Sequence, residues 1–110
     1  MIALISSVPE EGKLFATQLK KKSVIAGKAV FQGRISGGDV VYIVSGMGKV
    51  NAAHAATVLF DRYSPSLLIL FGVGGAYPLT GLRVGDIAVA EKEVHAFPYF
   101  CSSFWMEAMF

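Results

Sequence analysis

Apolar residues in this chain come in short runs separated by polar, glycine-containing breaks, which predicts a domain of alternating strands and helices. The first run, residues 2–7, favours a strand. Pro9 and the acidic residues behind it suit the first turn of a helix, since proline fits there and acids favour the positive end of the helix dipole. We expect this helix to extend to about Lys21, with the lysine cluster 20–22 at its solvent-exposed end.

The middle of the chain predicts a hairpin followed by a second helix. Two β-rich segments begin at Lys28 and Asp39, and the glycines between them are typical of a tight turn, so we expect an antiparallel pair. The alanine-rich residues 49–62 predict a helix. The side of this helix that we expect to be packed carries Val50, Ala53, Thr57 and Phe60.

The most apolar stretch is residues 66–73, SLLILFGV, which predicts a strand covered on both faces, as in the middle of a parallel sheet. A further strand is predicted over 82–92, after a glycine-containing turn. The alternating elements predict an α/β fold with a mixed, largely central sheet flanked by helices.

The composition changes near the end of the chain. Residues 96–110 are rich in aromatic side chains, and Glu107 is their only charged residue. We interpret residues 1–95 as the N-terminal part of an α/β domain and residues 96–110 as an aberrant tail, left by truncation or a shifted reading frame. The alternative is a final amphipathic helix packed on the sheet.

Composition and charge exclude several classes of protein. The chain has 110 residues and is 54% hydrophobic, but no apolar run approaches the ~20 residues that cross a bilayer, so we expect a soluble, cytoplasmic protein. A net charge of +2 indicates no nucleic-acid surface. Cys101 is the single cysteine, and His54 and His95 have no partner at metal-ligand spacing, so no metal and no cofactor is expected.

Two predicted strands end in glycine turns, at 45–48 and 72–75. Ligands of open α/β sheets lie beyond the carboxyl ends of strands, and glycine lets backbone N–H groups approach a ligand, so both turns are candidate ligand floors. Sharp turning alone explains the glycines equally well. Asn51 stands at the third glycine position of a dinucleotide fingerprint, and Val50 follows Gly48-Lys49, so neither that fingerprint nor a Walker loop is indicated.

Four blocks, in order along the chain to about His95, resemble the nucleoside phosphorylase and nucleosidase superfamily. They are VPEE (8–11), SGMGKVNAA (45–53), FGVGGAYP (71–78) and LRVGDIAVAE (82–91). Within the superfamily they look most like futalosine hydrolases, because of the first and third blocks. The alternative is the methylthioadenosine/S-adenosylhomocysteine nucleosidases, which share the second and fourth.

The resemblance implies a phosphorylase/hydrolase-like fold, here truncated, that hydrolyses the N-glycosidic bond of a purine nucleoside. The expected substrate is futalosine, cleaved to hypoxanthine and dehypoxanthinyl futalosine in menaquinone biosynthesis, by an enzyme that forms homo-oligomers. Glu11 matches the family glutamate that positions or activates the attacking water. The resemblance places at the substrate Gly72, Val73, Gly74, Gly75, Met106 and Glu107, the last two as an echo of a ribose-binding pair.

Charge and length refine this expectation. The stretches around Glu11 and Gly72 contain no arginine or lysine to hold a phosphate, which favours hydrolysis over phosphorolysis. Lys49 is the one basic residue beside a glycine turn. No candidate for the family aspartate that assists purine departure follows Asp86, so we expect the short chain to be inactive alone. A non-catalytic binding module of the same fold is the further alternative.

Overall fold

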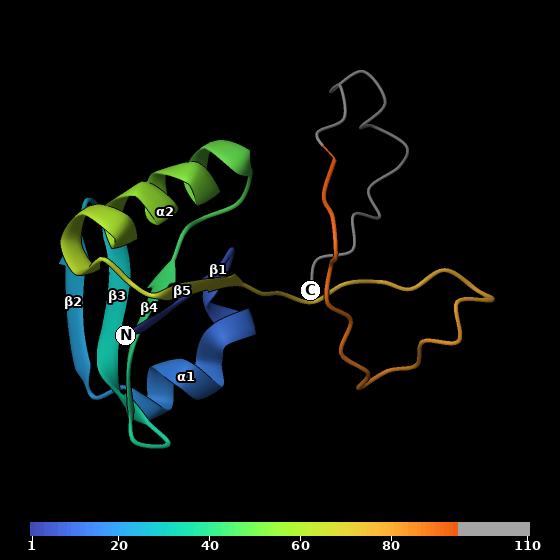
Figure 1. Ribbon diagram of the computed structural model, residues 1–110, viewed down its shortest axis with the longest axis horizontal. Helices are drawn as coiled ribbons and strands as arrows, with labels where there is room; N and C mark the ends of the chain where they lie inside the picture. The colour runs from blue at the N-terminus through green and yellow to red at the C-terminus, as the bar shows by residue number, and fades with distance from the viewer. Residues whose placement is uncertain (95–110) are drawn as a thin grey trace. The chain divides into compact units, whose positions relative to one another are not determined.

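The computed structural model describes residues 1–94 and divides into two compact units, residues 1–72 and residues from 73 onward (Figure 1). The helices and strands of the described residues all belong to the first unit. They are β1 (Ile2–Ser6), the 3-10 helix η1 (Pro9–Gly12), α1 (Lys13–Gln18), β2 (Lys21–Ile25), β3 (Lys28–Ile35), β4 (Gly38–Val44), α2 (Lys49–Tyr63) and β5 (Leu67–Leu70).

The five strands form one mixed sheet in the order β2-β3-β4-β1-β5. β1 runs parallel to both of its neighbours, β4 and β5, whereas β3 is antiparallel to β2 and β4. The α/β fold class with a mixed sheet is therefore confirmed. The hairpin and the second helix also form where the sequence predicts them.

The core has two layers because successive residues of a strand point to opposite faces of the sheet. On one face, Ala3 and Ile5 pack with Ala55 and Leu59 of α2. On the other face, Leu4 and Tyr42 pack with Phe15 of α1. Figure 1 shows α2 and α1 on these two sides of the sheet.

Two turns of the same kind join β2, β3 and β4. Ala26-Gly27 have φ of 51° and 76°, and Ser36-Gly37 have φ of 50° and 80°. Two successive positive φ values give a turn whose twist matches that of the strands, and glycine takes up the second position without strain. Gly38 already pairs with Ile35 and belongs to β4 rather than to the turn.

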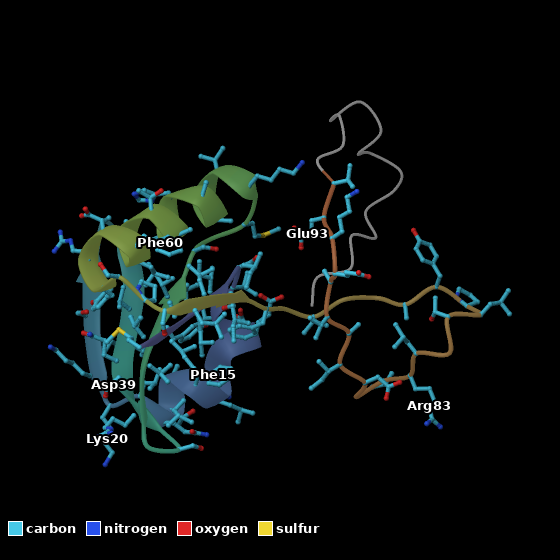
Figure 2. All side chains as sticks on the ribbon, in the orientation of Figure 1. Phe15, Lys20, Asp39, Phe60, Arg83 and Glu93 are labelled. Carbon is cyan, nitrogen blue, oxygen red and sulfur yellow. The ribbon has the colours of Figure 1, made fainter. Side chains whose placement is uncertain are left out.

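The packed side of α2 is not the predicted one. Ala55 and Leu59 are buried, whereas Val50 is 84% exposed and Phe60 projects from the helix at 53% exposure (Figure 2). By the 3.6-residue period, the predicted line of side chains lies on almost the opposite side of the helix from the buried pair. Alanine spacing alone did not distinguish these two sides, because alanine occurs on both.

The expectation that residues 66–73 form a central strand covered on both faces is wrong. β5 comprises only Leu67–Leu70, stands at the edge of the sheet, and leaves Ile69 41% exposed. An apolar run indicates that its side chains favour burial, but it does not determine where the strand lies in the sheet. That position depends on strand pairing, and among residues 1–94 β5 pairs with β1 alone.

Two further segments differ from expectation. Lys21 and Lys22 of the lysine cluster, which was interpreted as a helix end, begin β2, and Lys20 precedes it. Pairing of β2 with β3 along its whole length outweighs the low strand propensity of lysine. Residues 82–92 form no strand, because a strand requires a neighbour and none of the described residues pairs with this segment. Residues 96–110, with Met106 and Glu107, lie outside the described residues, so the expected tail stays a prediction. No helix within residues 1–94 is long and apolar enough to cross a membrane.

Candidate functional site

The carboxyl ends of β1, β4 and β5 lie together at one end of the sheet, because these strands are parallel. We call this end of the sheet its carboxyl edge. Backbone hydrogen bonds hold the residues beyond them together: Ser45 N donates to Ser6 O at 2.9 Å, and Phe71 N donates to Ile5 O at 3.0 Å. Gly46 N donates to Ser7 O at 3.0 Å. This is the edge at which ligands of open α/β sheets bind.

Glu11 is placed at this edge by the tight turn after β1. Its Oε2 accepts hydrogen bonds from Ser7 N at 3.1 Å and from Val8 N at 3.4 Å, and the side chain is half-buried. Pro9 supplies the fixed φ of the first helical position, so the short helix η1 begins immediately after Val8. The carboxylate is therefore folded back over the start of its own helix and held there by backbone donors.

Gly72 lies directly beside this carboxylate. A Cβ built on Gly72 would stand 2.9 Å from Oε1 of Glu11 and 3.3 Å from its Cδ. Only a glycine leaves room for the carboxylate at this distance. The structure thus brings together two of the residues that the resemblance singles out.

Of the other predicted positions, three belong to the second unit and two lie outside the described residues. Val73, Gly74 and Gly75 are exposed and belong to the second unit. Met106 and Glu107 fall outside the described residues. Their proposed contact with substrate stays a prediction.

Ser6 and Tyr42, which were not predicted from the sequence, lie under the Glu11 turn. Both are fully buried, and the Tyr42 hydroxyl is 2.7 Å from Ser6 Oγ. Burial raises the pKa of Tyr42; the hydrogen bond with Ser6 opposes this, and the charges of Glu11 and Glu10 add to it. The sequence did contain a signal for Tyr42. It stands in the middle of an apolar strand, where a buried tyrosine hydroxyl requires a hydrogen-bond partner.

The other glycine turn, residues 45–48, is braced from outside. Lys28 Nζ donates to Ser45 O and, at 3.2 Å, to Asn51 Oδ1. Asn51 Nδ2 donates to Met47 O at 2.8 Å. Asn51 therefore supports the turn at the position where a dinucleotide fingerprint would have glycine. Lys49, the basic residue considered for phosphate, is exposed.

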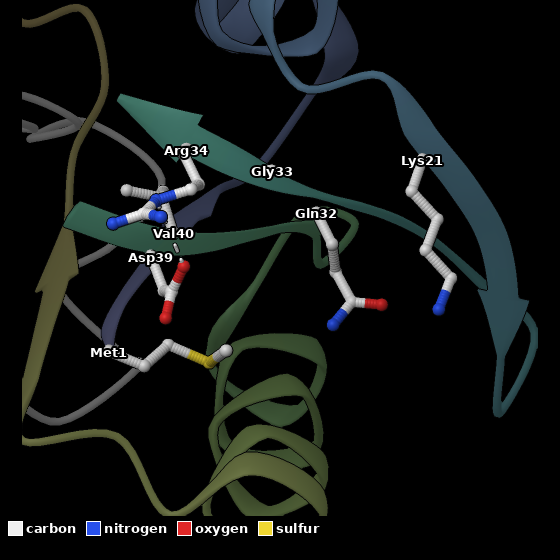
Figure 3. Close-up of a pocket in the computed structure, with 7 residues that line it drawn as sticks. All are labelled: Met1, Lys21, Gln32, Gly33, Arg34, Asp39 and Val40. Carbon is white, nitrogen blue, oxygen red and sulfur yellow. Dashed lines mark ion pairs between the residues drawn. The ribbon is translucent and has the colours of Figure 1, made fainter. Parts of the chain in front are cut away.

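A hollow of about 230 Å³ lies at the opposite end of the sheet, where β1 and β4 begin. Figure 3 shows the residues that line it. Its lining residues are Met1, Lys21, Gln32, Gly33, Arg34, Asp39 and Val40. Arg34 Nε and Asp39 Oδ1 are 3.5 Å apart, but both side chains are more than 60% exposed, at 71% and 62%, and such pairs contribute little. Because the hollow lies where β1 and β4 begin, it is remote from Glu11 at the carboxyl ends of these strands.

Within residues 1–94, no three histidine, cysteine, aspartate or glutamate side chains cluster as a metal site would require.

Residues 1–108 match the Phosphorylase superfamily, and the chain belongs to that superfamily. The 5'-methylthioadenosine/S-adenosylhomocysteine nucleosidase of Oceanobacillus iheyensis is 38% identical over 96 residues, which make up 86% of this chain and 42% of that protein. The chain therefore spans about two fifths of this relative.

Solved structures of nucleosidases are also similar to this chain. The nucleosidase of the same name from Colwellia psychrerythraea, in complex with adenine, superposes with a TM-score of 0.70 at 33% identity, covering 77% of this chain and 36% of that one. The futalosine hydrolase of Helicobacter pylori superposes with a TM-score of 0.61 at 17% identity over 67% of this chain and 33% of that one, a likeness of fold alone. The comparisons favour the methylthioadenosine/S-adenosylhomocysteine alternative over futalosine hydrolase.

Proposed function

We propose that this chain supplies the N-terminal part of a purine nucleosidase that hydrolyses the N-glycosidic bond of methylthioadenosine or S-adenosylhomocysteine. The observation that carries the proposal is the Glu11 carboxylate, held by two backbone N–H groups at the carboxyl edge of the sheet and bordered by Gly72. The identity to nucleosidases of that name supports the choice of substrate.

The proposed role of Glu11 follows from the chemistry of the bond. As the bond between C1′ and the purine nitrogen breaks, its electron pair leaves with the base and positive charge develops on the sugar. A nearby carboxylate stabilises that charge, orients water toward C1′ and accepts the proton that the water loses. Protonation of the departing purine falls to residues beyond the part of the chain described here.

Local charge supports water rather than phosphate as the nucleophile. The turn that carries Glu11 also carries Glu10, and two carboxylates would repel a phosphate dianion. The Lys28 ammonium is engaged with Ser45 O and Asn51, and Lys49 is exposed on the first turn of α2.

The test is a chimera that joins residues 1–94 to the part of the Oceanobacillus iheyensis nucleosidase beyond the matched region. Release of purine base would be assayed from methylthioadenosine, S-adenosylhomocysteine and futalosine, with and without inorganic phosphate. We expect phosphate-independent release of adenine, and none from the 110-residue chain alone. A requirement for phosphate, or release from futalosine only, would contradict the proposal.

The matched variants are Glu11→Gln and Glu10→Gln, two neighbouring carboxylates of which only the first accepts the hydrogen bonds from Ser7 and Val8. A general acid or base contributes about 10²- to 10⁴-fold, so Glu11→Gln should lower kcat by that factor. Glu10 is exposed, and its replacement should leave kcat within about twofold. Equal activity of the two variants would remove Glu11 from the mechanism.

A further inference from the structure

Two linked hydrogen bonds, one buried and one partly buried, lie beneath the turn that carries Glu11. The Tyr42 hydroxyl in β4 lies 2.7 Å from Ser6 Oγ at the end of β1. Ser6 Oγ donates in turn to the carbonyl oxygen of Val8 at 3.0 Å. Ser6 and Tyr42 are both 0% exposed.

The donor in each of these hydrogen bonds follows from the number of hydrogens available. A serine hydroxyl has one hydrogen, and Ser6 gives it to the Val8 carbonyl, so the Tyr42 hydroxyl must be the donor to Ser6. Burial raises the pKa of Tyr42, so the phenol keeps the proton that it donates. Successive donors of this kind polarise and strengthen one another in a buried site.

The backbone before Glu11 and the backbone after it both contact residues of these two hydrogen bonds. Ser6 fixes the carbonyl of Val8, and the N–H of Val8 donates to the Glu11 carboxylate. On the other side, a Cβ built on Gly12 would stand 2.0 Å from the Tyr42 hydroxyl. The Tyr42 side chain therefore packs directly against the backbone of the residue that follows Glu11.

The Tyr42 ring is itself held in place by other aromatic rings. It stacks on Phe31, with centroids 5.6 Å apart and an interplanar angle of 20°, and its centroid lies 6.0 Å from that of Phe71. Phe71 immediately precedes Gly72, the residue that borders the Glu11 carboxylate. One buried ring thus contacts the supports of both residues of the candidate site.

We propose that Tyr42 is a positioning residue for Glu11: its hydroxyl, through Ser6 and against Gly12, fixes the turn that aims the Glu11 carboxylate. The inference rests on the proposed function for the role of Glu11, and it adds a residue from β4, an element distant in sequence from η1. Tyr42→Phe removes only the hydroxyl and leaves the ring packing, so it separates the hydrogen bond from the core.

The first test is amide hydrogen exchange on the full 110-residue chain, which requires no activity. In Tyr42→Phe and in Ser6→Ala we expect the amides of Ser7 and Val8 to lose about tenfold in protection, the equivalent of one hydrogen bond. The amides of β4 should change by less than about twofold, and Tyr63→Phe in α2 serves as the control. Unchanged protection at Ser7 and Val8, or an equal loss throughout the sheet, would overturn the proposal.

The second test is kinetic and uses the chimera. Misplacement of a catalytic group lowers the rate of the chemical step, so Tyr42→Phe should lower kcat about 10- to 100-fold and leave KM within about twofold. In the Glu11→Gln background the same substitution should have little further effect, since its target is already lost. Full kcat in Tyr42→Phe would refute positioning. An inactive chimera would count against the proposed function alone, while hydrogen exchange would still decide the role of Tyr42.

Discussion

Gly72 and Glu11 lie against each other at the carboxyl edge of the sheet, so closely that a Cβ on Gly72 would stand 2.9 Å from Oε1 of Glu11. The two residues come from different segments, one after β5 and the other in η1 after β1. Their contact exists because β1 and β5 are parallel neighbours, which brings both carboxyl ends to the same edge.

Gly72→Ala should displace the Glu11 carboxylate while leaving the fold stable. The atom that the new methyl group meets is the far end of a flexible side chain, which can move aside at little cost. We expect kcat of the chimera to fall by about 10- to 100-fold, because the carboxylate no longer faces C1′ correctly. The free energy of unfolding should change by less than about 1 kcal/mol, measured by urea titration.

Gly38→Ala is the matched control for this substitution. The new Cβ would have its nearest contact at 3.7 Å, an ordinary van der Waals distance, on the Ile35 carbonyl oxygen. If both alanine variants lowered kcat alike, the effect at position 72 would not come from Glu11.

Gly12→Ala should instead destabilise the fold. Its Cβ would stand 2.0 Å from the hydroxyl of Tyr42 and 2.1 Å from Cζ, and the buried ring cannot move aside. Overpacking of this kind costs about 1–3 kcal/mol, measurable as a lower urea midpoint. The shorter side chain of Tyr42→Leu should relieve the clash, so the double variant should be more stable than the sum of the single effects predicts. Strict additivity would contradict the contact.

The buried phenol makes stability dependent on pH at the alkaline end. Burial raises the pKa of Tyr42 above its ordinary value of 10.0. Because the folded state holds this proton more tightly than the unfolded state, the contribution is complete below about pH 10 and is lost as pH rises through the folded pKa. Urea midpoints measured at rising pH should therefore fall above about pH 10, and Tyr42→Phe should fall less steeply. Parallel curves for the two proteins would argue against a raised pKa.

Lys28→Met should loosen the glycine turn at 45–48. The Lys28 ammonium donates to Ser45 O and to Asn51 Oδ1, and methionine keeps the length of the chain without the donors. We expect a loss of about 1–3 kcal/mol in the free energy of unfolding, typical for a hydrogen bond to a charged group. Lys21→Met in β2, where the side chain is exposed, is the control and should change stability by less than about 0.5 kcal/mol. A loss no larger than the control would mean that Lys28 does not brace the turn.

We expect copies of the chain to associate through the exposed edge strand β5. Leu67, Ile69 and Leu70 are 41–52% exposed, and within residues 1–94 the outer edge of β5 has no paired strand. A flat apolar edge is a template for further strands, and a lysine on it opposes pairing. Ile69→Lys should therefore shift sedimentation toward smaller species at equal concentration. Identical profiles would locate the association elsewhere.

The sequence predicted the elements better than it predicted their environment. Residues 28–35 and 49–63 were found because their periods, two and 3.6, are local properties of the chain. The edge position of Leu67–Leu70 and the buried side of α2 depend on which strand pairs with β1, and that is set by distant segments.

In the candidate site, too, individual residues could be predicted from the sequence but their contacts could not. Glu11 was named only because four sequence blocks resemble a family, whereas Gly72 also stood in a glycine turn at the end of a predicted strand. Their contact, and the support from Tyr42, depend on three strand ends meeting, which no local pattern reports. Tyr42 lies among apolar residues of β4, and its buried hydrogen-bond partner Ser6 is identified only by the structure.

The pair of two-residue turns at Ala26-Gly27 and Ser36-Gly37 also has a kinetic consequence. β2, β3 and β4 form an uninterrupted meander whose contacts are all close in sequence, and such hairpins close in about 1–10 μs. β1 and β5 must instead find partners across the meander and α2, a slower search because longer loops have to close. We therefore expect the meander to form first and the edge that carries Glu11 and Gly72 to be assembled last, when β1 and β5 dock.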